Sequence, residues 1–87
     1  MTDTGIRAKA WYVYQLHMGY LKAYDLDLTD VIHQTVYLKD ATEMAVVERV
    51  GTMFFGHVLP PTTFVPIVDT SPWGAASIEI EVVARQR

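Results

Sequence analysis

Two acidic residues near the C-terminal end have the spacing of a catalytic carboxylate pair. Glu79 and Glu81 alternate with apolar residues between Ile78 and Val83. Side chains two apart on a strand point to the same face, so both carboxylates are expected to lie together. Like charges at this distance can raise one pKa and produce a general acid or base. An ordinary solvated strand face gives the same pattern, and the residues alone leave both interpretations open.

The three histidines do not form a local metal-binding pattern. They stand at positions 17, 33 and 57, separations of 16 and 24 residues, and no pair has the spacing of four that a helix uses to place two ligands together. His17 falls on the predicted apolar face of a helix, which favours a hydrogen-bonded core or interface histidine. A zinc or iron site built from histidines with Glu48 or Glu79 is the less favoured alternative. We therefore expect no metal and no cofactor.

Other common catalytic devices are missing from the sequence. There is no cysteine, hence no thiolate nucleophile and no disulfide. The five glycines are isolated and form no phosphate-binding loop. Ser71 lacks the flanking glycines of a nucleophile elbow and is better interpreted as a turn residue.

Charge and length limit the classes of partner. The 87 residues carry a formal net charge of −3 with scattered basic residues, which argues against nucleic acid. No apolar run is long enough for a membrane span, and the opening residues do not resemble a signal peptide. We expect a cytoplasmic protein whose residues 1–87 form one small domain, with 51% hydrophobic residues hinting at subunit packing.

The hydrophobic pattern predicts five elements in the order α-β-α-β-β. Apolar residues recur at steps of three and four over residues 6–24, which is typical of a helix with a wide apolar face. A second helix follows Asp40, with Glu43 completing a capping box and Gly56 ending the helix. Its predicted inner face holds Met44, Val47, Gly51 and Phe54, flanked by Val46, Val50 and Phe55. Both helices are expected on one face of a sheet, an α+β fold.

Three strands are predicted around these helices. Residues 31–38 are rich in β-branched and aromatic residues on both faces, so this strand should be central. Residues 62–69 form a second strand, which Pro66 restricts to an edge or bulge. Residues 70–74 are a turn, and residues 75–84 a strand with Ile78, Ile80 and Val82 on one face.

Three segments together resemble the reactive-intermediate deaminase (Rid, YjgF-type) family. Residues 26–40, with LDLTDV followed by TVYLKD, resemble the family's segment GLSLDDVVKTTVYLKD. The run FFG at 54–56 with Pro60 and Pro61, and IEIEVVA at 78–84, resemble the end of its second helix and its last strand. The resemblance covers about residues 6–85. It implies a chorismate-mutase-like α+β fold that assembles as a trimer around a β-barrel core, with ligand pockets between subunits.

The chain departs from the family pattern at three places. The family's N-terminal strands, which include a tyrosine or similar pocket residue, are missing before the first helix, and whether Met1 is the natural start stays open. The family's substrate-gripping arginine follows its prolines, where Thr62 stands here, next to Thr63. A neutral hydroxyl cannot replace a bidentate cation. The asparagine of the second helix falls at Glu48, which would repel a carboxylate ligand.

The resemblance implies one retained catalytic candidate. Glu79 stands where the family's glutamate orients the hydrolytic water, in a deamination that needs no metal or cofactor. Because the anchor is missing, we expect a non-canonical Rid-like subunit with a small-ligand pocket near Glu79, Thr62, Thr63 and Glu48. The alternative is an imine or enamine hydrolase whose substrate lacks the usual carboxylate. A nuclease, a label sometimes attached to the family, fits the charge least.

The predicted first helix carries more aromatic residues than one core face can hold. Successive residues on a helix are 100° apart, so Trp11, Tyr12 and Tyr14 cannot all face the same side. Large exposed apolar patches are rare on monomers, and bare sheet edges aggregate unless they are covered. We therefore expect a homo-oligomer, such as the family's trimer, or a complex with another polypeptide that covers this helix and the sheet edge.

Overall fold

Helix α1 (Asp3–Ala23) is the longest element of the computed structural model, which describes residues 3–56, 58–67 and 78–85. Ile6, Ala10, Tyr14 and Leu21 are buried at steps of four and seven, as the sequence pattern predicts. The prediction placed Tyr24 on this face, but Tyr24 is 71% exposed. The helix ends before it, because the chain turns at Asp25, which has a φ of 62°.

Short 3-10 turns precede the central strand and the second helix. In the first, η1 (Leu28–Asp30), Asp27 and Asp30 form a reciprocal capping box. The second turn, η2 (Ala41–Glu43), leads into helix α2 (Met44–Phe55), and the Asp40 side chain accepts a hydrogen bond from the Thr42 N–H. The predicted capping box of Asp40 and Glu43 is therefore wrong, because the first turn is a 3-10 turn that brings a nearer N–H to the carboxylate. Gly56 ends α2 with a φ of 79°, as predicted.

The sheet has three strands in the order β2-β1-β3. Strand β1 (Val31–Leu38) is central and pairs in parallel with β2 (Thr62–Pro66) and antiparallel with β3 (Ile78–Ala84). The central position of β1 and the edge position of β2 are confirmed. The predicted turn at 70–74 and the outer parts of the predicted strands, 68–69 and 75–77, lie outside the described residues.

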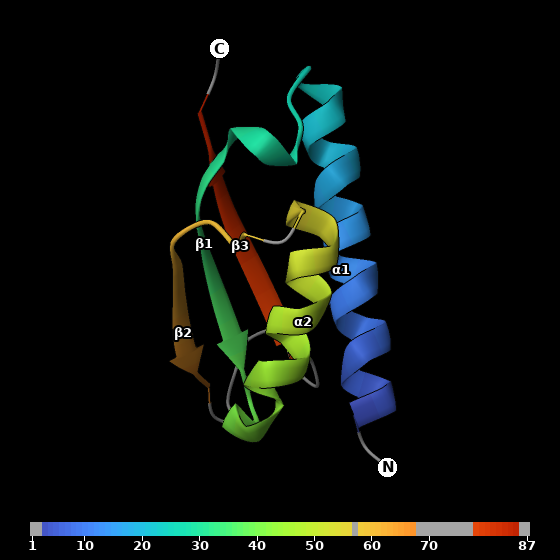
Figure 1. Cartoon of the computed structure of the whole chain (residues 1–87), viewed down its shortest axis with the longest axis vertical. Coiled ribbons are helices and arrows are strands. Elements are labelled where there is room, and N and C mark those ends of the chain that lie inside the picture. Colours follow the sequence, from blue (N-terminus) through green and yellow to red (C-terminus); the bar gives the residue numbers. More distant parts are fainter. Residues whose placement is uncertain (1–2, 57, 68–77, 86–87) are drawn as a thin grey trace.

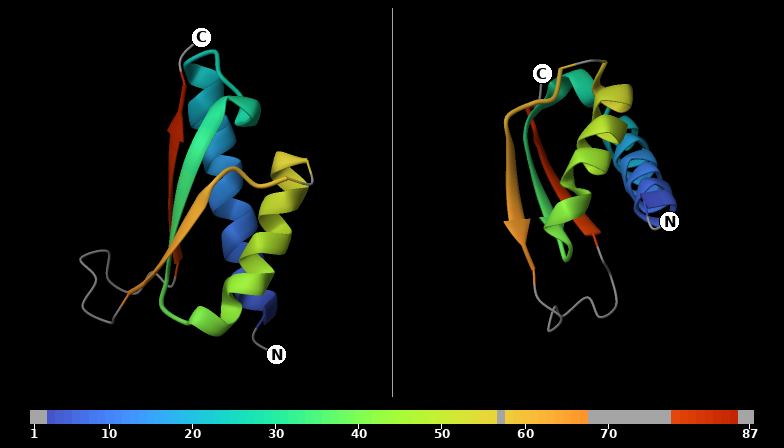
Figure 2. Two further views of the ribbon diagram at one scale, coloured as in Figure 1. Left: turned by 60° about the vertical axis from the view of Figure 1, so that its left-hand side comes forward. Right: turned by 60° about the horizontal axis from the view of Figure 1, so that its bottom comes forward.

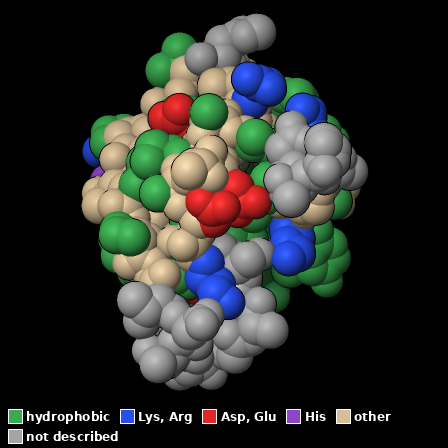
Figure 3. Space-filling view, turned by 90° about the horizontal axis from the view of Figure 1, so that it is seen from below, with side chains coloured by type: hydrophobic (Ala, Val, Ile, Leu, Met, Phe, Trp, Pro, Cys, Tyr) green, Lys and Arg blue, Asp and Glu red, His purple; other side chains and the backbone are tan. Residues whose placement is uncertain are grey.

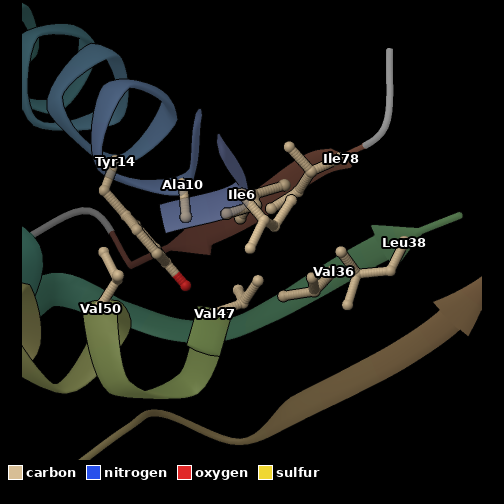
Figure 4. Close-up of a cluster of buried hydrophobic side chains, with 9 residues drawn as sticks. Ile6, Ala10, Tyr14, Val36, Leu38, Val47, Val50 and Ile78 are labelled. Atoms are coloured by element: carbon tan, nitrogen blue, oxygen red, sulfur yellow. The ribbon is translucent and has the colours of Figure 1, made fainter. Parts of the chain in front are cut away.

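Both helices cover the same face of this sheet, the α+β arrangement expected from the sequence (Figures 1 and 2). Figure 4 shows the core between the layers, where Tyr14 of α1 reaches between Val47 and Val50 of α2 toward the sheet. Val36 and Ile78 close the core from the strands. Gly51 of α2 gives Tyr14 its room, since a Cβ there would lie 3.1 Å from the Tyr14 hydroxyl.

The outer surface of α1 carries large apolar side chains in contact with solvent. Tyr12 is 60% exposed and Tyr20 62% exposed, and Leu16 between them is also exposed. Trp11 packs its ring against Phe54 at 4.6 Å between centroids but keeps 42% of its surface open. The prediction that the aromatic residues of this helix cannot all reach one core is confirmed.

Among the described residues, neither helix combines the length and the hydropathy that crossing a bilayer requires.

Candidate functional site

The face of the sheet that the helices leave uncovered holds most of the polar side chains of the strands. On β1 these are His33, Thr35 and Tyr37, because the even-numbered residues from Gln34 to Leu38 are buried under the helices. In the register of the sheet, Tyr37 lies opposite Glu79 of β3. Thr35 lies opposite Glu81 of β3 on one side and Thr63 of β2 on the other, so these three residues form one cross-strand row. The predicted common face of Glu79 and Glu81 is thereby confirmed.

Tyr37 lies beside both glutamates and is hydrogen-bonded to one of them. Its hydroxyl donates to Oε1 of Glu81 at 3.1 Å, and Glu79 lies directly opposite Tyr37 across the strand pair. The hydrogen bond to Glu81, some burial and the charges of Glu81 and Glu79 raise the pKa of Tyr37. Tyr37 is therefore a neutral hydrogen-bond donor beside two carboxylates at neutral pH. Glu79 is half-buried and Glu81 exposed, so the two carboxylates differ in environment.

On the opposite side of Tyr37, the same face carries a histidine–threonine pair. Nε2 of His33 lies 3.1 Å from Oγ1 of Thr63, on the neighbouring parallel strand. Either atom can donate in this contact, depending on the histidine tautomer. The pair places an imidazole and a hydroxyl on the uncovered face, with Thr63 in the same cross-strand row as Glu81 and His33 in the next row.

Thr62, the residue aligned with the family's arginine, points into the covered layer instead. Its hydroxyl accepts a hydrogen bond from Nε2 of Gln34 at 3.0 Å and donates to the Pro60 carbonyl at 2.8 Å. Gln34 is 1% exposed, and its Oε1 accepts from the Tyr14 hydroxyl at 2.8 Å. This chain of hydrogen bonds uses the hydroxyl of Thr62 internally, so Thr63 is the threonine of this pair that lies on the uncovered face.

Burial raises the pKa of Tyr14 to about 12, and the hydrogen bond to Gln34 offsets part of this effect. The Tyr14 hydroxyl therefore stays protonated and donates to Gln34 through the whole physiological pH range. No local pattern predicts this contact, because 20 residues separate its partners.

Within one chain, the four predicted site residues do not converge. Glu79 and Thr63 share the uncovered face, whereas Thr62 points to the other side of the sheet. Glu48 lies exposed on α2, in the helical layer behind the sheet. Sequence reasoning did not select Tyr37 or Thr35, although the alternation of residues 31–38 would have placed both beside Glu79 once the strand register was known.

The histidines are spread over different parts of the molecule. Nε2 of His17 lies 2.6 Å from the Ile80 carbonyl oxygen, so Nε2 carries the proton and donates, in line with the predicted hydrogen-bonded histidine. His57 lies outside the described residues. Over residues 3–56, 58–67 and 78–85, no three acidic or histidine side chains come close enough together to hold a metal ion.

Strand β3 has a free edge next to α1. The Gln34 N–H bonds to the Pro61 carbonyl, so the even-numbered residues of β1 turn their backbone groups toward β2. Their antiparallel partners, Ile80 and Val82, therefore turn their N–H and C=O groups away from β1. In the described part of the chain no further strand pairs with this edge, where His17 caps the Ile80 carbonyl.

Comparisons with known proteins agree with this arrangement. The family model described as Endoribonuclease L-PSP matches residues 1–86. Among solved structures, RidA from the Antarctic bacterium Psychrobacter sp. is 26% identical with a TM-score of 0.81 over 90% of this chain and 62% of its own. A candidate endoribonuclease from Thermotoga maritima is 29% identical with a TM-score of 0.83 over 94% of this chain and 63% of its own.

A Mycobacterium tuberculosis member of the YjgF/YER057c/UK114 family is 26% identical, with a TM-score of 0.78 over 91% of this chain and 66% of its own. The chain thus spans slightly less than two thirds of the length of these relatives. No curated protein matches it. With a family model matched over nearly its whole length and these structures as neighbours, the chain belongs to the Endoribonuclease L-PSP family, the group of the RidA and YjgF proteins.

Proposed function

We propose that this chain is a Rid-like subunit that works inside an oligomer or in a complex with another polypeptide. The observation that carries the proposal is the uncovered face of the sheet, on which Tyr37, Glu79 and Thr63 lie with no layer of the described chain above them. A three-stranded sheet with only one covered face buries little apolar surface for its length. A second layer supplied by another subunit would complete the fold and enclose these groups.

Two further surfaces support the same proposal. The free edge of β3 presents the Ile80 N–H and the backbone N–H and C=O of Val82, which an extended segment of another chain could pair with. The exposed side chains of Leu16 and Tyr20 add apolar area on α1. Aromatic side chains of this kind are enriched at the centres of protein interfaces.

In this assembly we place a small-ligand pocket above Glu79 and Thr63, between subunits. The pocket would contain hydrogen-bond donors and acceptors and two carboxylates, and it would lack the arginine with which deaminating members of the family are expected to bind an acid. A neutral or positively charged ligand therefore fits this chemistry better than a carboxylate does. Glu48 and Thr62 of the same chain do not line this pocket, because they lie on the other side of the sheet. Glu48 could contribute to it only from a neighbouring subunit.

The native mass of the purified protein tests the subunit proposal. We expect a homo-oligomer, with a trimer first among the alternatives, or co-purification with a second polypeptide. Light scattering that gives a stable, monodisperse monomer at all concentrations would contradict it. Amide hydrogen exchange then locates the contact, because pairing at the free edge would slow exchange at Ile80 and Val82 while leaving Glu79 and Glu81 unchanged.

The second candidate function is hydrolysis of an imine that has no carboxylate. The observation in its favour is the environment of Glu79, half-buried beside the neutral donor Tyr37. Glu79 would take a proton from water while the water oxygen attacks the carbon of the protonated C=N group, and would then pass this proton to the nitrogen of the adduct, so that the C–N bond breaks and a ketone and an ammonium ion leave. In a panel of neutral and cationic imines, Glu79→Gln should abolish ammonia release and Glu81→Gln should largely preserve it. No turnover on any substrate of the panel would end this candidate.

RNA cleavage has the least support from the surface of the molecule. Figure 3 shows Lys and Arg side chains scattered among hydrophobic and polar ones on one face, without a continuous basic patch. Phosphate binding depends on clustered positive charge, and the uncovered sheet face presents Glu79 and Glu81 instead. We therefore propose no nuclease function for this chain.

A further inference from the structure

The outer edge of strand β3 and one side of helix α1 together leave a place for a further strand. In the part of the chain that the structure describes, β3 is an edge strand. The Ile80 N–H and the N–H and C=O of Val82 point away from β1, where a neighbouring strand would bond to them. The Ile80 carbonyl oxygen is already bonded to Nε2 of His17, which fixes the position of α1 beside this edge.

Helix α1 presents apolar side chains on the side next to this edge. Tyr14 lies on one side of His17 around the helix and packs on Phe54 of α2, with 5.4 Å between ring centroids. Leu16 and Tyr20 lie on the other side of His17, away from α2, and both are exposed. Side chains that an added strand turned toward the helical layer would pack on Leu16 and Tyr20, so they should be apolar.

The opposite face of an added strand would meet two carboxylates. Glu79 and Glu81 lie on the uncovered face of β3, and their partners on β1, Tyr37 and Thr35, are uncharged at neutral pH. Residues directly opposite each other on paired strands interact favourably when their charges are opposite and unfavourably when they are alike. Lys or Arg on the added strand would therefore be favoured opposite Glu79 and Glu81.

The same carboxylates disfavour a second copy of β3 as the neighbour. Antiparallel pairing of two β3 strands over the full length of Ile78–Ala84 is centred on Glu81, so the two Glu81 side chains would lie opposite each other. We infer that the β3 edge binds an extended segment of a different polypeptide in which apolar residues alternate with Lys or Arg. This inference rests on the proposed function, in which another chain covers the edge, and adds the chemistry of that partner.

The test titrates the full chain with two synthetic strands, Thr-Val-Lys-Val-Lys-Val-Thr and its charge control Thr-Val-Glu-Val-Glu-Val-Thr, and follows backbone amides by NMR. With the lysine peptide we expect saturable shifts and slower hydrogen exchange at Ile80 and Val82. The glutamate peptide should bind about tenfold more weakly, because two attractive cross-strand pairs become repulsive.

A charge reversal separates this local effect from the net charge of the protein. The double variant Glu79→Lys/Glu81→Lys should prefer the glutamate peptide. The control Glu43→Lys/Glu48→Lys changes the net charge equally, but both of its positions lie at α2, behind the sheet, so the preference for the lysine peptide should remain.

Two further variants test the backbone edge and the apolar side of α1. Val82→Pro removes an N–H that points away from β1, so the β1–β3 hydrogen bonds stay while lysine-peptide binding should weaken about tenfold or more. Leu16→Ser should weaken this binding several-fold through lost apolar contact. Met18→Ser is the matched control, since Met18 is 43% exposed and Leu16 39%, on opposite sides of His17 around α1.

Equal binding of the two peptides, or full lysine-peptide binding to Val82→Pro, would overturn the inference. Protection of Ile80 and Val82 that rises with protein concentration alone would also overturn it, because a second copy would then occupy the edge. The native mass distinguishes this failure from failure of the proposed function. An oligomer or complex that binds neither peptide at the β3 edge contradicts this inference alone, whereas a stable monomer that binds neither contradicts both.

Discussion

The two faces of the sheet differ in the environment of their polar side chains. On the covered face, the polar atoms of Gln34 are paired with Tyr14 and Thr62, and over the described residues no buried side-chain N or O lacks a partner. On the uncovered face, Tyr37, Glu79 and Glu81 lie within reach of solvent and of any second subunit. The comparison teaches that the polar groups of the covered face are used within the fold, whereas those of the uncovered face are open to solvent and free of any structural task in the core.

The largest expected effect is the loss of the Tyr14 ring from the covered face. Tyr14→Ala removes a fully buried aromatic side chain and leaves Gln34 without its donor, which should destabilise the fold by about 3–5 kcal/mol. Tyr12→Ala removes the same ring from the exposed side of the same helix, and about 0.5 kcal/mol or less is expected. Urea unfolding of both variants measures the difference. Similar losses for the two would break the comparison between covered and solvent-exposed surfaces.

High pH should weaken the covered face through Tyr14. The folded-state pKa is raised from 10.0 to about 12, so the protonated form is favoured on folding, and this contribution is complete below pH 10. It is lost as the pH rises from 10.0 through about 12, a change on the order of 2–3 kcal/mol. Unfolding free energies measured across this window in the wild type and in Tyr14→Phe give the test, and the variant should show the flatter profile. Equal slopes would show that Tyr14 does not titrate with folding.

The hydrogen bonds among Tyr14, Gln34 and Thr62 should behave as a unit. Tyr14→Phe and Gln34→Leu each strand a buried partner, and each should cost about 1–3 kcal/mol. The double variant should lose less than the sum of the two, because the donor and acceptor of the shared bond leave together. A double-mutant cycle by chemical denaturation checks this. Strict additivity would mean that the contact contributes nothing specific.

The smallest effects belong to the uncovered face. Glu81→Gln weakens the acceptor of Tyr37 and removes one of two neighbouring like charges, so stability should change by about 0.5 kcal/mol or less. Glu79→Gln should be equally mild for folding. Thermal unfolding of both variants tests the expectation. A large loss of stability in either variant would show that its carboxylate stabilises the fold, as the polar groups of the covered face do.

Much of the fold was predictable because it depends on local pattern. Residues 31–38 form a strand, which their β-branched composition indicates. Gly56 ends a helix, because the left-handed φ required there favours glycine. The 3-10 turn at Ala41–Glu43 was missed because a helix and a 3-10 turn share the same capping residues.

The candidate site was predictable only in part. The alternation of residues 78–83 placed Glu79 and Glu81 on one face, as the structure confirms. The side to which Thr62 or Thr63 points depends on register against β1, and a shift of one residue exchanges them. Register is a long-range property, as is the contact from Gln34 to Tyr14, and neither leaves a local signal.

Of the three strands that the structure describes, β1 is the one that pairs with both others, since β2 and β3 each pair with β1 and not with one another. In kinetic terms neither edge strand can be added before β1 is in place, and loss of β1 leaves no remaining strand pair. We therefore expect a folding transition state centred on β1 and α1, with slow folding for a chain of this size because β1 and β3 are far apart in sequence. The backbone N–H groups of β1 that are hydrogen-bonded to β2 or β3 should then exchange with solvent only when the entire chain unfolds.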